Sequence, residues 1–411
     1  MKKQDAVRTV GPETARMLEL GHPWVVADAY TRKWPTGNSG QSVELCDSLG
    51  RFLATALLDP DERIVARVLE RKRIQLDRPW LTERLKRAIE LRRHHAALDG
   101  STAYRVVNAE GDGLPGLTVD RYADYLMLQL YSFAWRPHLK LITQILQELL
   151  SPAGIYEKSR PQKTRELEAV SDNKNYGRLL AGKAAPQRLE VLENGLTFLV
   201  SLEQGLNTGL FLDQRRNRRD LMTRVKGKRV LNLFAYTGAF SVAAAAAGAV
   251  QVTSVDASAG YTDWSRDNFA ANRINPKQHA FIVGDCLAVL SKLAQEGKRF
   301  DVILMDPPSF STTTKSRFTT RGGTSDLVAA TLPLLTDNGL LITASNHQKV
   351  DTAEYLKELR RGALQADCDL RVISLLGQPE DFPYPVTFPE GRYLKYATCV
   401  KSGSQAERRK Q

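Results

Sequence analysis

The second half of the chain alternates short apolar stretches with helical patterns, and this alternation restricts the fold more than any other feature of the sequence. Five stretches have the length and composition of strands: 229–234, 252–256, 280–283, 300–305 and 339–344. Helical patterns lie at 241–248, 259–272, 286–295 and 325–335. Such alternation predicts an α/β fold, in which a doubly wound parallel sheet carries helices on both faces. Residues 393–400 are expected to add antiparallel strands at the edge of this sheet.

Acidic residues follow three of these predicted strands, at the edge where doubly wound sheets bind their ligands. Asp256 is placed to accept both hydroxyls of a ribose, Asp285 to accept an adenine amino group, and Asp306 opens a rigid Asp-Pro-Pro run. The loop after the first strand contains a single glycine, Gly238, which allows close approach of a ligand. A nicotinamide dinucleotide requires a G-x-G-x-x-G pattern, so a pyrophosphate cofactor is disfavoured. The set predicts S-adenosylmethionine (SAM) as the cofactor.

The length of 411 residues predicts two to three domains. Residues 1–75 contain four to six short apolar runs separated by turns, which is typical of a small β-barrel, and we interpret it as a binding module. Residues 76–189 are expected to form a middle α+β module, and 190–402 the doubly wound domain. The polar residues 403–411 are expected to be a flexible tail.

Two segments of the middle module carry more specific expectations. A helix is predicted over 79–98, with a buried stripe of Leu81, Leu85, Ala88 and Ile89. The basic residues placed off this stripe are Arg84, Lys86, Arg87, Arg92 and Arg93, and they form either an RNA contact or a solvated helix face. Residues 171–188, rich in Lys, Gly, Ala and Pro, are expected to form an exposed loop.

The chain is basic, with 58 Lys and Arg against 46 Asp and Glu and a formal net charge of +12. Residues 63–93 hold eleven basic against four acidic residues, and residues 213–229 hold eight against two. Clustered positive charge favours a polyanionic partner such as a nucleic acid.

The sequence lacks the features of membrane proteins, disulfide-bonded proteins and zinc proteins. No apolar run reaches the roughly 18 residues that a membrane span needs. The four cysteines, Cys46, Cys286, Cys368 and Cys399, are scattered, which fits a reducing compartment and offers no zinc-type pair. We therefore expect a cytoplasmic protein without a metal site.

Several strings resemble those of the bacterial SAM-dependent methyltransferases of large-subunit ribosomal RNA that carry an N-terminal PUA domain. The strings are His22-Pro23-Trp24, Ile64-Val65-Ala66-Arg67-Val68, the run 111–121 (GDGLPGLTVDR), the run 208–215 (TGLFLDQR), the run 231–238 (LNLFAYTG), Asp306-Pro307-Pro308 and Pro389-Glu390-Gly391. The resemblance covers nearly the whole chain. It implies a PUA β-barrel, a middle α+β module and a Rossmann-like class I methyltransferase domain, acting on ribosomal RNA.

The resemblance, together with the strand ends, gives a set of expected site residues. Those expected to bind the cofactor are Phe211, Asp213, Arg215, Phe234, Tyr236, Gly238, Asp256, Asp285, Cys286 and Asp306. Those expected to act in catalysis are Asp306, Pro307, Pro308, Phe310 and Asn346. His347 is expected either to stack on a base or contact phosphate, or to be an ordinary surface histidine.

The chain departs from the best-known members of this architecture, which make 5-methylcytosine. That reaction needs a cysteine thiolate to add to carbon 6 of the base, and in those members the cysteine follows the fifth strand. Here the fifth strand is followed by Ser345-Asn346-His347, which resembles the enzymes that make 7-methylguanine. Guanine N7 has a free lone pair and needs only positioning. We therefore expect methylation of guanine N7, with Asn346 bonding a base edge and Phe310 stacking on its face.

Two alternatives stay open at this point. One is formation of 5-methylcytosine by a misplaced thiol, and the other is a non-catalytic protein that binds RNA during ribosome assembly. The sequence between Phe310 and Asp326, with Lys315, Arg317 and Arg321, is expected to be a mobile loop that closes over RNA. A homodimer is possible on this reading.

Overall fold

The computed structural model describes residues 7–158, 175–308, 310–312, 317–319 and 323–404. The chain divides into two compact units. Unit 1 contains Met1–Val191, Val200–Thr208 and Glu380–Gly391, and unit 2 contains Leu192–Leu199, Gly209–Pro379 and Arg392–Gln411. The predicted boundaries at residues 75, 189 and 402 remain predictions. No helix within the described ranges is long and apolar enough to cross a membrane.

The N-terminal part of unit 1 is a curled five-stranded sheet in the order β1-β3-β4-β5-β2. Its strands are β1 (Val7–Thr9), β2 (Trp24–Val26), β3 (Ser42–Cys46), β4 (Phe52–Leu58) and β5 (Ile64–Glu70). This confirms the short strands expected there. The helix α1 (Pro12–Glu19) was not expected, although Pro12 at its first turn is a typical start signal. Ala15 and Leu18 of α1 are buried in the core of this sheet.

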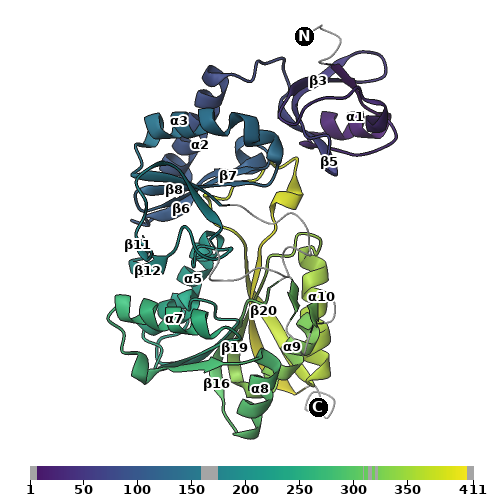
Figure 1. The fold of residues 1–411 in the computed structure, drawn as a ribbon. Coiled ribbons are helices and arrows are strands. Elements are labelled where there is room, and N and C mark those ends of the chain that lie inside the picture. Colours follow the sequence, from purple (N-terminus) through teal and green to yellow (C-terminus); the bar gives the residue numbers. More distant parts are fainter. Residues whose placement is uncertain (1–6, 159–174, 309, 313–316, 320–322, 405–411) are drawn as a thin grey trace. The chain divides into compact units, whose positions relative to one another are not determined.

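A second sheet in unit 1 has the order β10-β9-β8-β7-β6. Its strands are β6 (Ala103–Asn108), β7 (Leu117–Tyr122), β8 (Tyr125–Leu130), β9 (Gly154–Lys158) and β10 (Gly177–Gly182). The helices α2 (Arg78–His95) and α3 (Leu139–Leu150) pack on it through a shared apolar core (Figure 1). The β8–β9 pair is parallel, and α3 supplies the crossover that a parallel pair requires. The expected exposed loop at 171–188 is wrong over β10, which pairs with β9.

One residue of α2 contradicts its expected position. The stripe of Leu81, Leu85, Ala88 and Ile89 is buried as expected, but Arg92 is buried too. Arg92 lies seven residues after Leu85 and therefore falls on the same helix face. Its guanidinium donates to Asp112 at 2.6 Å and to the backbone oxygen of Asp381 at 2.8 Å.

The segment Glu380–Gly391 belongs to unit 1, although the strands on either side of it belong to unit 2. Asp381 is fully buried and accepts the backbone N–H of Arg105 at 2.8 Å. Phe388 packs against His22 and Trp24, with ring centroids 5.4 Å and 4.7 Å away. Part of the His-Pro-Trp string thus has a structural role within unit 1.

Unit 2 is built on a seven-stranded sheet in the order β15-β14-β13-β16-β19-β21-β20. Its strands are β13 (Arg229–Leu233), β14 (Gln251–Asp256), β15 (Ala280–Val283), β16 (Phe300–Met305), β19 (Leu335–Ser345), β20 (Cys368–Leu376) and β21 (Lys395–Ser404). The first five are parallel, and β21 runs antiparallel to both β19 and β20. The doubly wound sheet and the antiparallel strands at its edge are both confirmed.

Alternate residues of each strand point to opposite faces of this sheet, and helices cover both (Figure 1). Leu231 and Leu233 pack with the helices α8 (Cys286–Gln295), α9 (Gly323–Thr331) and α10 (Thr352–Gln365). Val230 and Val252 pack on the other face with α5 (Arg215–Met222) and α6 (Ala239–Ala246). The helix α7 (Ala259–Ala271) contacts α6, β14 and β15.

Two small hairpins complete the described strands. The strands β11 (Leu189–Glu193) and β12 (Leu196–Val200) form one two-stranded sheet, and β17 (Phe310–Thr312) and β18 (Arg317–Thr319) form the other. The second hairpin follows β16 directly and lies within the segment that was expected to be a mobile loop.

Candidate active site

The strand register places the expected site residues in one row at the carboxyl edge of the parallel strands. Leu233 of β13 pairs with Val255 of β14 on one side and with Met305 of β16 on the other. Asp256 is the last residue of β14 and Asp306 directly follows β16, so the two carboxylates flank the end of β13. With strands about 4.8 Å apart, their backbones lie roughly 10 Å from each other. This row surrounds the switch in strand order between β13 and β16, where such sheets bind ligands.

The loop after β13 has an unusual backbone. Phe234 and Tyr236 have φ values of +58° and +51°, which non-glycine residues rarely adopt, and Gly238 follows with +76°. A Cβ at residue 238 would meet Ser265 Oγ at 1.9 Å, so glycine is required there. Strained residues of this kind concentrate at ligand sites.

Asp256 organises this loop through both of its carboxylate oxygens. Oδ2 accepts the backbone N–H of Tyr236 at 2.8 Å, and Oδ1 accepts that of Ser258 at 2.9 Å. A carboxylate oxygen can accept more than one hydrogen bond, so these two backbone bonds do not by themselves exclude a ligand from Asp256. A ribose supplies two hydroxyl donors of the required kind.

Asp285 and Cys286 lie at the start of α8. Asp285 is the N-cap residue, and its Oδ1 accepts the backbone N–H of Ala288 at 3.1 Å. The thiol of Cys286 is buried, and burial raises its pKa to about 12. Asp285 therefore has a structural role in capping α8 besides any contact with a ligand.

Asp306 is held by the 3-10 helix η5 (Leu212–Gln214). Gln214 Nε2 donates to Asp306 Oδ2 at 2.8 Å, and Tyr393 Oη donates to the neighbouring carboxylate of Asp213 at 2.7 Å. Desolvation, with the charge of Asp213 as a second cause, raises the pKa of Asp306 to about 7. The bond from Gln214 and the positive charge of Arg218 act in the opposite direction.

The remaining residues of this segment differ in exposure. Phe211 is exposed and its ring lies 5.2 Å from that of Tyr236, which in turn lies 4.5 Å from Tyr261. Arg215 is buried, and so is Arg218, which forms a bidentate pair with Glu193 at 2.6 and 2.7 Å. Phe211 thus presents an aromatic surface beside the loop after β13.

The end of β19 carries the expected catalytic Asn346, which is exposed directly after Ser345. Lys395 was not expected to take part. Its Nζ, buried within β21, donates to the backbone oxygen of His347 at 2.6 Å and to that of Tyr393 at 2.8 Å. Desolvation lowers the pKa of Lys395 to about 8 and is also the first cause that lowers the pKa of His347.

Three expected residues after β16 are placed only in part. Pro307 is buried and Pro308 is exposed. Phe310 begins β17, and its side chain lies outside the described part of the structure, as do residues 313–316 and 320–322.

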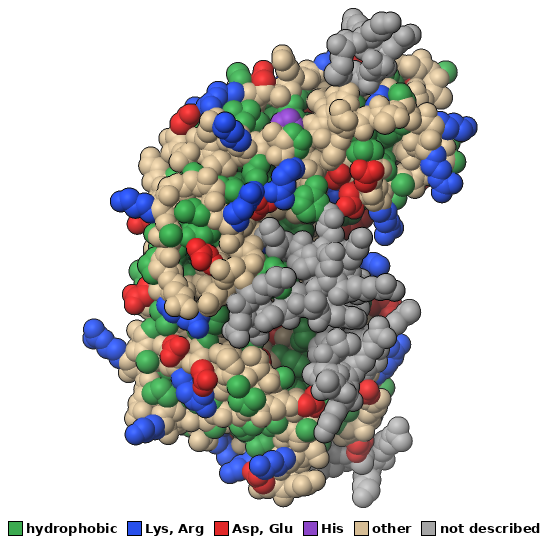
Figure 2. All heavy atoms as spheres, viewed as in Figure 1, with side chains coloured by type: hydrophobic (Ala, Val, Ile, Leu, Met, Phe, Trp, Pro, Cys, Tyr) green, Lys and Arg blue, Asp and Glu red, His purple; other side chains and the backbone are tan. Residues whose placement is uncertain are grey.

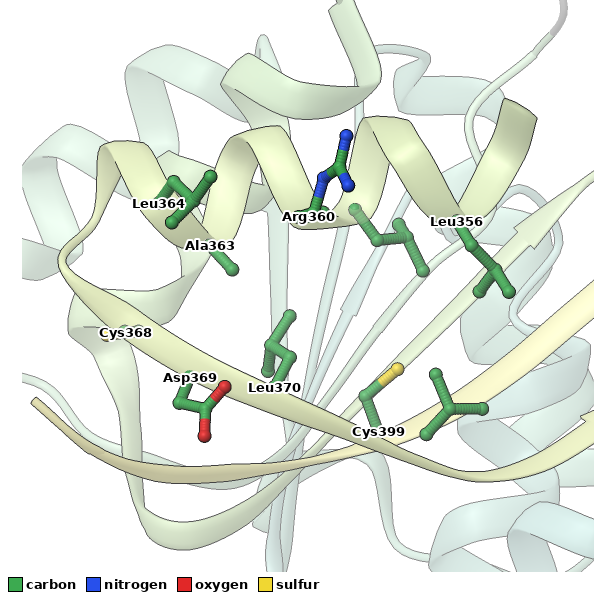
Figure 3. Close-up of a pocket in the computed structure, with 10 residues that line it drawn as sticks. Leu356, Arg360, Ala363, Leu364, Cys368, Asp369, Leu370 and Cys399 are labelled. Atoms are coloured by element: carbon green, nitrogen blue, oxygen red, sulfur yellow. The ribbon is translucent and has the colours of Figure 1, made fainter. Parts of the chain in front are cut away.

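The four cysteines share one property. All are buried, and burial raises the pKa of each thiol. Cys368 and Cys399 line a mainly apolar pocket of about 150 Å³ beneath α10, between this helix and the strands β20 and β21 (Figure 3). Cys399 lies four positions along β21 from the pairing of Lys395 with Ser345, or roughly 13 Å.

Positive charge is not gathered on one patch of the face shown in Figure 2, where Lys and Arg side chains are scattered among acidic ones. Of the cluster at 213–229, Arg215 and Arg218 are buried, and Arg224 pairs with Asp220 at 2.7 Å. No group of three or more His, Cys, Asp or Glu in the described ranges could hold a metal ion.

Comparison with known proteins agrees with this geometry. Residues 113–389 match the S-adenosylmethionine-dependent methyltransferase family, and residues 9–71 match a PUA-like domain. The chain belongs to the S-adenosylmethionine-dependent methyltransferase family. The methyltransferase is 33% identical over 379 residues to ribosomal RNA large subunit methyltransferase I of Yersinia pseudotuberculosis, covering 92% of this chain and 95% of the relative.

Solved structures resemble it over nearly the same length. SMU.776, described as a candidate methyltransferase and solved in complex with SAH, has a TM-score of 0.86 and 29% identity, covering 96% of this chain and 99% of that chain. A candidate SAM-dependent methyltransferase from Streptococcus mutans has a TM-score of 0.83, with the same identity and coverage. SAM is the cofactor of this family, as expected from the sequence. The residues at the strand switch fit this cofactor, because the carboxylates of Asp256 and Asp306 and the exposed ring of Phe211 offer acceptors and an aromatic surface there.

Proposed function

We propose that this methyltransferase modifies a base of large-subunit ribosomal RNA and that the base is guanine, methylated at N7. The substrate class is supported by the relative from Yersinia, whose name states that activity and which matches 92% of this chain. The N-terminal PUA-like domain is consistent with an RNA substrate.

The observation that carries the choice of guanine is the state of the cysteines. A thiol that attacks carbon 6 of cytosine must be accessible and readily ionised. Each thiol here is buried with a raised pKa, and the expected catalytic position after β19 is occupied by Ser345 and Asn346. Methylation of N7 needs no thiol, since the attacking atom is a ring nitrogen with a free lone pair.

The residues of this chain would then act by positioning. SAM supplies an electrophilic methyl group on a sulfonium. Asp256 would hold the ribose of the cofactor, and Asp306 with the two following prolines would border the transfer site. Asn346 would bond a base edge and Phe310 would stack on its face. N7 loses no proton on methylation, so the chemistry requires alignment and no general base. The base does gain a positive charge, which an ionised Asp306 beside it would stabilise.

The experiment that tests the proposal is nucleoside-resolved mass spectrometry of ribosomal RNA from cells with and without the gene. The expected result is loss of one 7-methylguanine from the large-subunit RNA. Loss of one 5-methylcytosine would contradict the choice of base but not the substrate class. An unchanged modification profile, together with absence of methyl transfer in vitro, would favour a non-catalytic role in RNA binding.

A further inference from the structure

Two buried amides lie behind Asp306 and form a chain of hydrogen bonds that ends on its carboxylate. Asn217 Nδ2 donates to Gln214 Oε1 at 2.6 Å, and Gln214 Nε2 donates to Asp306 Oδ2 at 2.8 Å. Asn217 is fully buried in α5, and Gln214 is 4% exposed. Asn217 lies in α5, Gln214 ends η5, and Asp306, which is 92 residues after Gln214, directly follows β16.

The buried asparagine is costly if its role is only to fill space. Among the described residues, Asn217 Oδ1 has no hydrogen-bond partner. A buried polar atom without a partner costs about 1–3 kcal/mol, and a leucine of similar volume would avoid that cost. The hydrogen bond that Asn217 donates to Gln214 is the interaction that explains why an amide side chain occupies this position.

This donation fixes the direction of the chain. An amide can present either its oxygen or its NH₂ group to a neighbour, and an ionised carboxylate can only accept. Because Asn217 donates to Gln214 Oε1, the NH₂ group of Gln214 must face Asp306. The same bond from Gln214 favours the ionised form of Asp306.

We propose that Asn217 and Gln214 are positioning residues that form an amide relay and keep the Asp306 carboxylate ionised and aimed at the transfer site. The inference rests on the proposed role of Asp306 at that site. Neither amide contacts the reacting groups in this account; both act through Asp306.

Other charged and titratable groups around Asp306 also affect its ionisation. The charged and titratable groups that act on Asp306 or are acted on by it come from η5, α5, α10 and β21: Asp213, Arg218, Tyr355 and Tyr396. Asp213 opposes ionisation of Asp306, and Arg218 favours it. Tyr393 donates to Asp213 at 2.7 Å, so each of the two carboxylates has a donor of its own.

The test is the pH profile of kcat for three variants, Asn217→Leu, Gln214→Leu and Asp306→Asn, measured on ribosomal RNA with saturating SAM. Gln365→Leu, on the exposed end of α10, is the matched control and should keep the parent profile. Asn217→Leu should change the melting temperature little, because it removes one buried unpaired oxygen, Asn217 Oδ1, and leaves another, Gln214 Oε1, without its donor. It should nevertheless move the rising limb of the profile to higher pH and lower kcat several-fold at pH 6.5. Gln214→Leu should do the same more strongly, by about tenfold.

The outcomes distinguish a failure of the proposed amide relay from a failure of the proposed role of Asp306. If Asp306→Asn keeps the parent kcat and profile, the proposed role of Asp306 fails. If Asp306→Asn loses turnover while both leucine variants keep the parent profile, the relay alone is overturned. A change in melting temperature without a change in profile would likewise reduce the two amides to a structural role. Should Gln214→Leu fail to fold, Asn217→Leu carries the test.

Discussion

At the scale of single residues, Asp306 shows a conflict between folding and function. Its carboxyl is largely desolvated beside Asp213, and its pKa rises to about 7 from the ordinary 3.8. Because the folded state then holds a proton that the unfolded state has released, the free energy of unfolding falls as pH rises from about 4 to 7. A residue that weakens the fold at neutral pH is retained more readily where its charge is needed.

The first prediction follows from this fall in the free energy of unfolding with rising pH. Asp306→Asn removes the ionisation and should raise the free energy of unfolding at pH 8 by about 2–4 kcal/mol, with a much smaller gain at pH 5. Chemical denaturation of parent and variant at the two pH values measures the difference. An equal gain at both values would mean that the carboxyl is not the titrating group.

A second prediction concerns the ribose contact. Asp256→Ala should weaken SAM binding by about 1–3 kcal/mol, because the ribose hydroxyls lose their acceptor. Titration calorimetry with SAM alone reports this without RNA. Asp263→Ala, at an exposed position of α7, is the control and should bind like the parent. Unchanged affinity in Asp256→Ala would show that the ribose lies elsewhere.

The sequence predicted the acidic residues at the strand ends, because the alternation of strands and helices and the order of the strands are enough to bring these residues together. Once β14 and β16 were assigned correctly, the positions of Asp256 and Asp306 at the strand ends followed. Gln214 and Lys395 escaped prediction for a physical reason. Amides and lysines at such positions are ordinary surface residues until tertiary packing buries them against a partner far away in sequence.

At the scale of elements, the alternating strands and helices of the second half were predicted well, whereas two elements of the first half, β10 and α1, were missed. The strand β16 and the helix α8 have the expected limits. The strand β10 was missed because its run Gly177–Gly182 has no clear alternation, and its pairing with β9 decides its conformation. The helix α1 was missed although Pro12 and the spacing of Ala15 and Leu18 carried the signal.

The third prediction tests the buried arginine of α2. Arg92→Met removes one partner of the pair with Asp112, in which both side chains are nearly fully buried. The loss should lower the free energy of unfolding by about 3–5 kcal/mol, because Asp112 is left as an uncompensated buried charge. Arg93→Met, one position along the helix and exposed, should change it by less than about 0.5 kcal/mol. Equal effects would contradict the assigned helix face.

The structure also sharpens the expectation for the basic face of α2. Arg84 is engaged by Glu70 and lies over the ring of Trp80, whereas Lys86 and Arg87 are exposed. Our fourth prediction is that replacing Lys86 and Arg87 by Gln flattens the slope of log affinity for RNA against log salt by roughly 0.7–0.9 for each lost phosphate contact. Filter binding across a salt series measures the slope. An unchanged slope would mean that this face of α2 is only solvated.

At the scale of the whole molecule, the chain passes between its two units several times. The methyltransferase sheet lies in unit 2, while the segment between β20 and β21 is bound into unit 1 through Asp381 and Phe388. The sequence could not predict this, because Glu380–Gly391 carries no periodic pattern and its position depends on partners such as Arg105 and Trp24. The PUA-like domain and the methyltransferase domain, in contrast, were expected from motifs and strand order.

The central claim is methyl transfer to guanine N7 without a thiol. The most direct test follows radiolabelled methyl from SAM into large-subunit ribosomal RNA, using a variant with all four cysteines changed to Ala. We predict that the variant keeps most of the parent activity and that the label lies in a guanine whose strand breaks after mild reduction and aniline treatment. Label in cytosine, or a covalent adduct between the parent protein and 5-fluorocytosine RNA that a folded single variant such as Cys286→Ala no longer forms, would contradict the account.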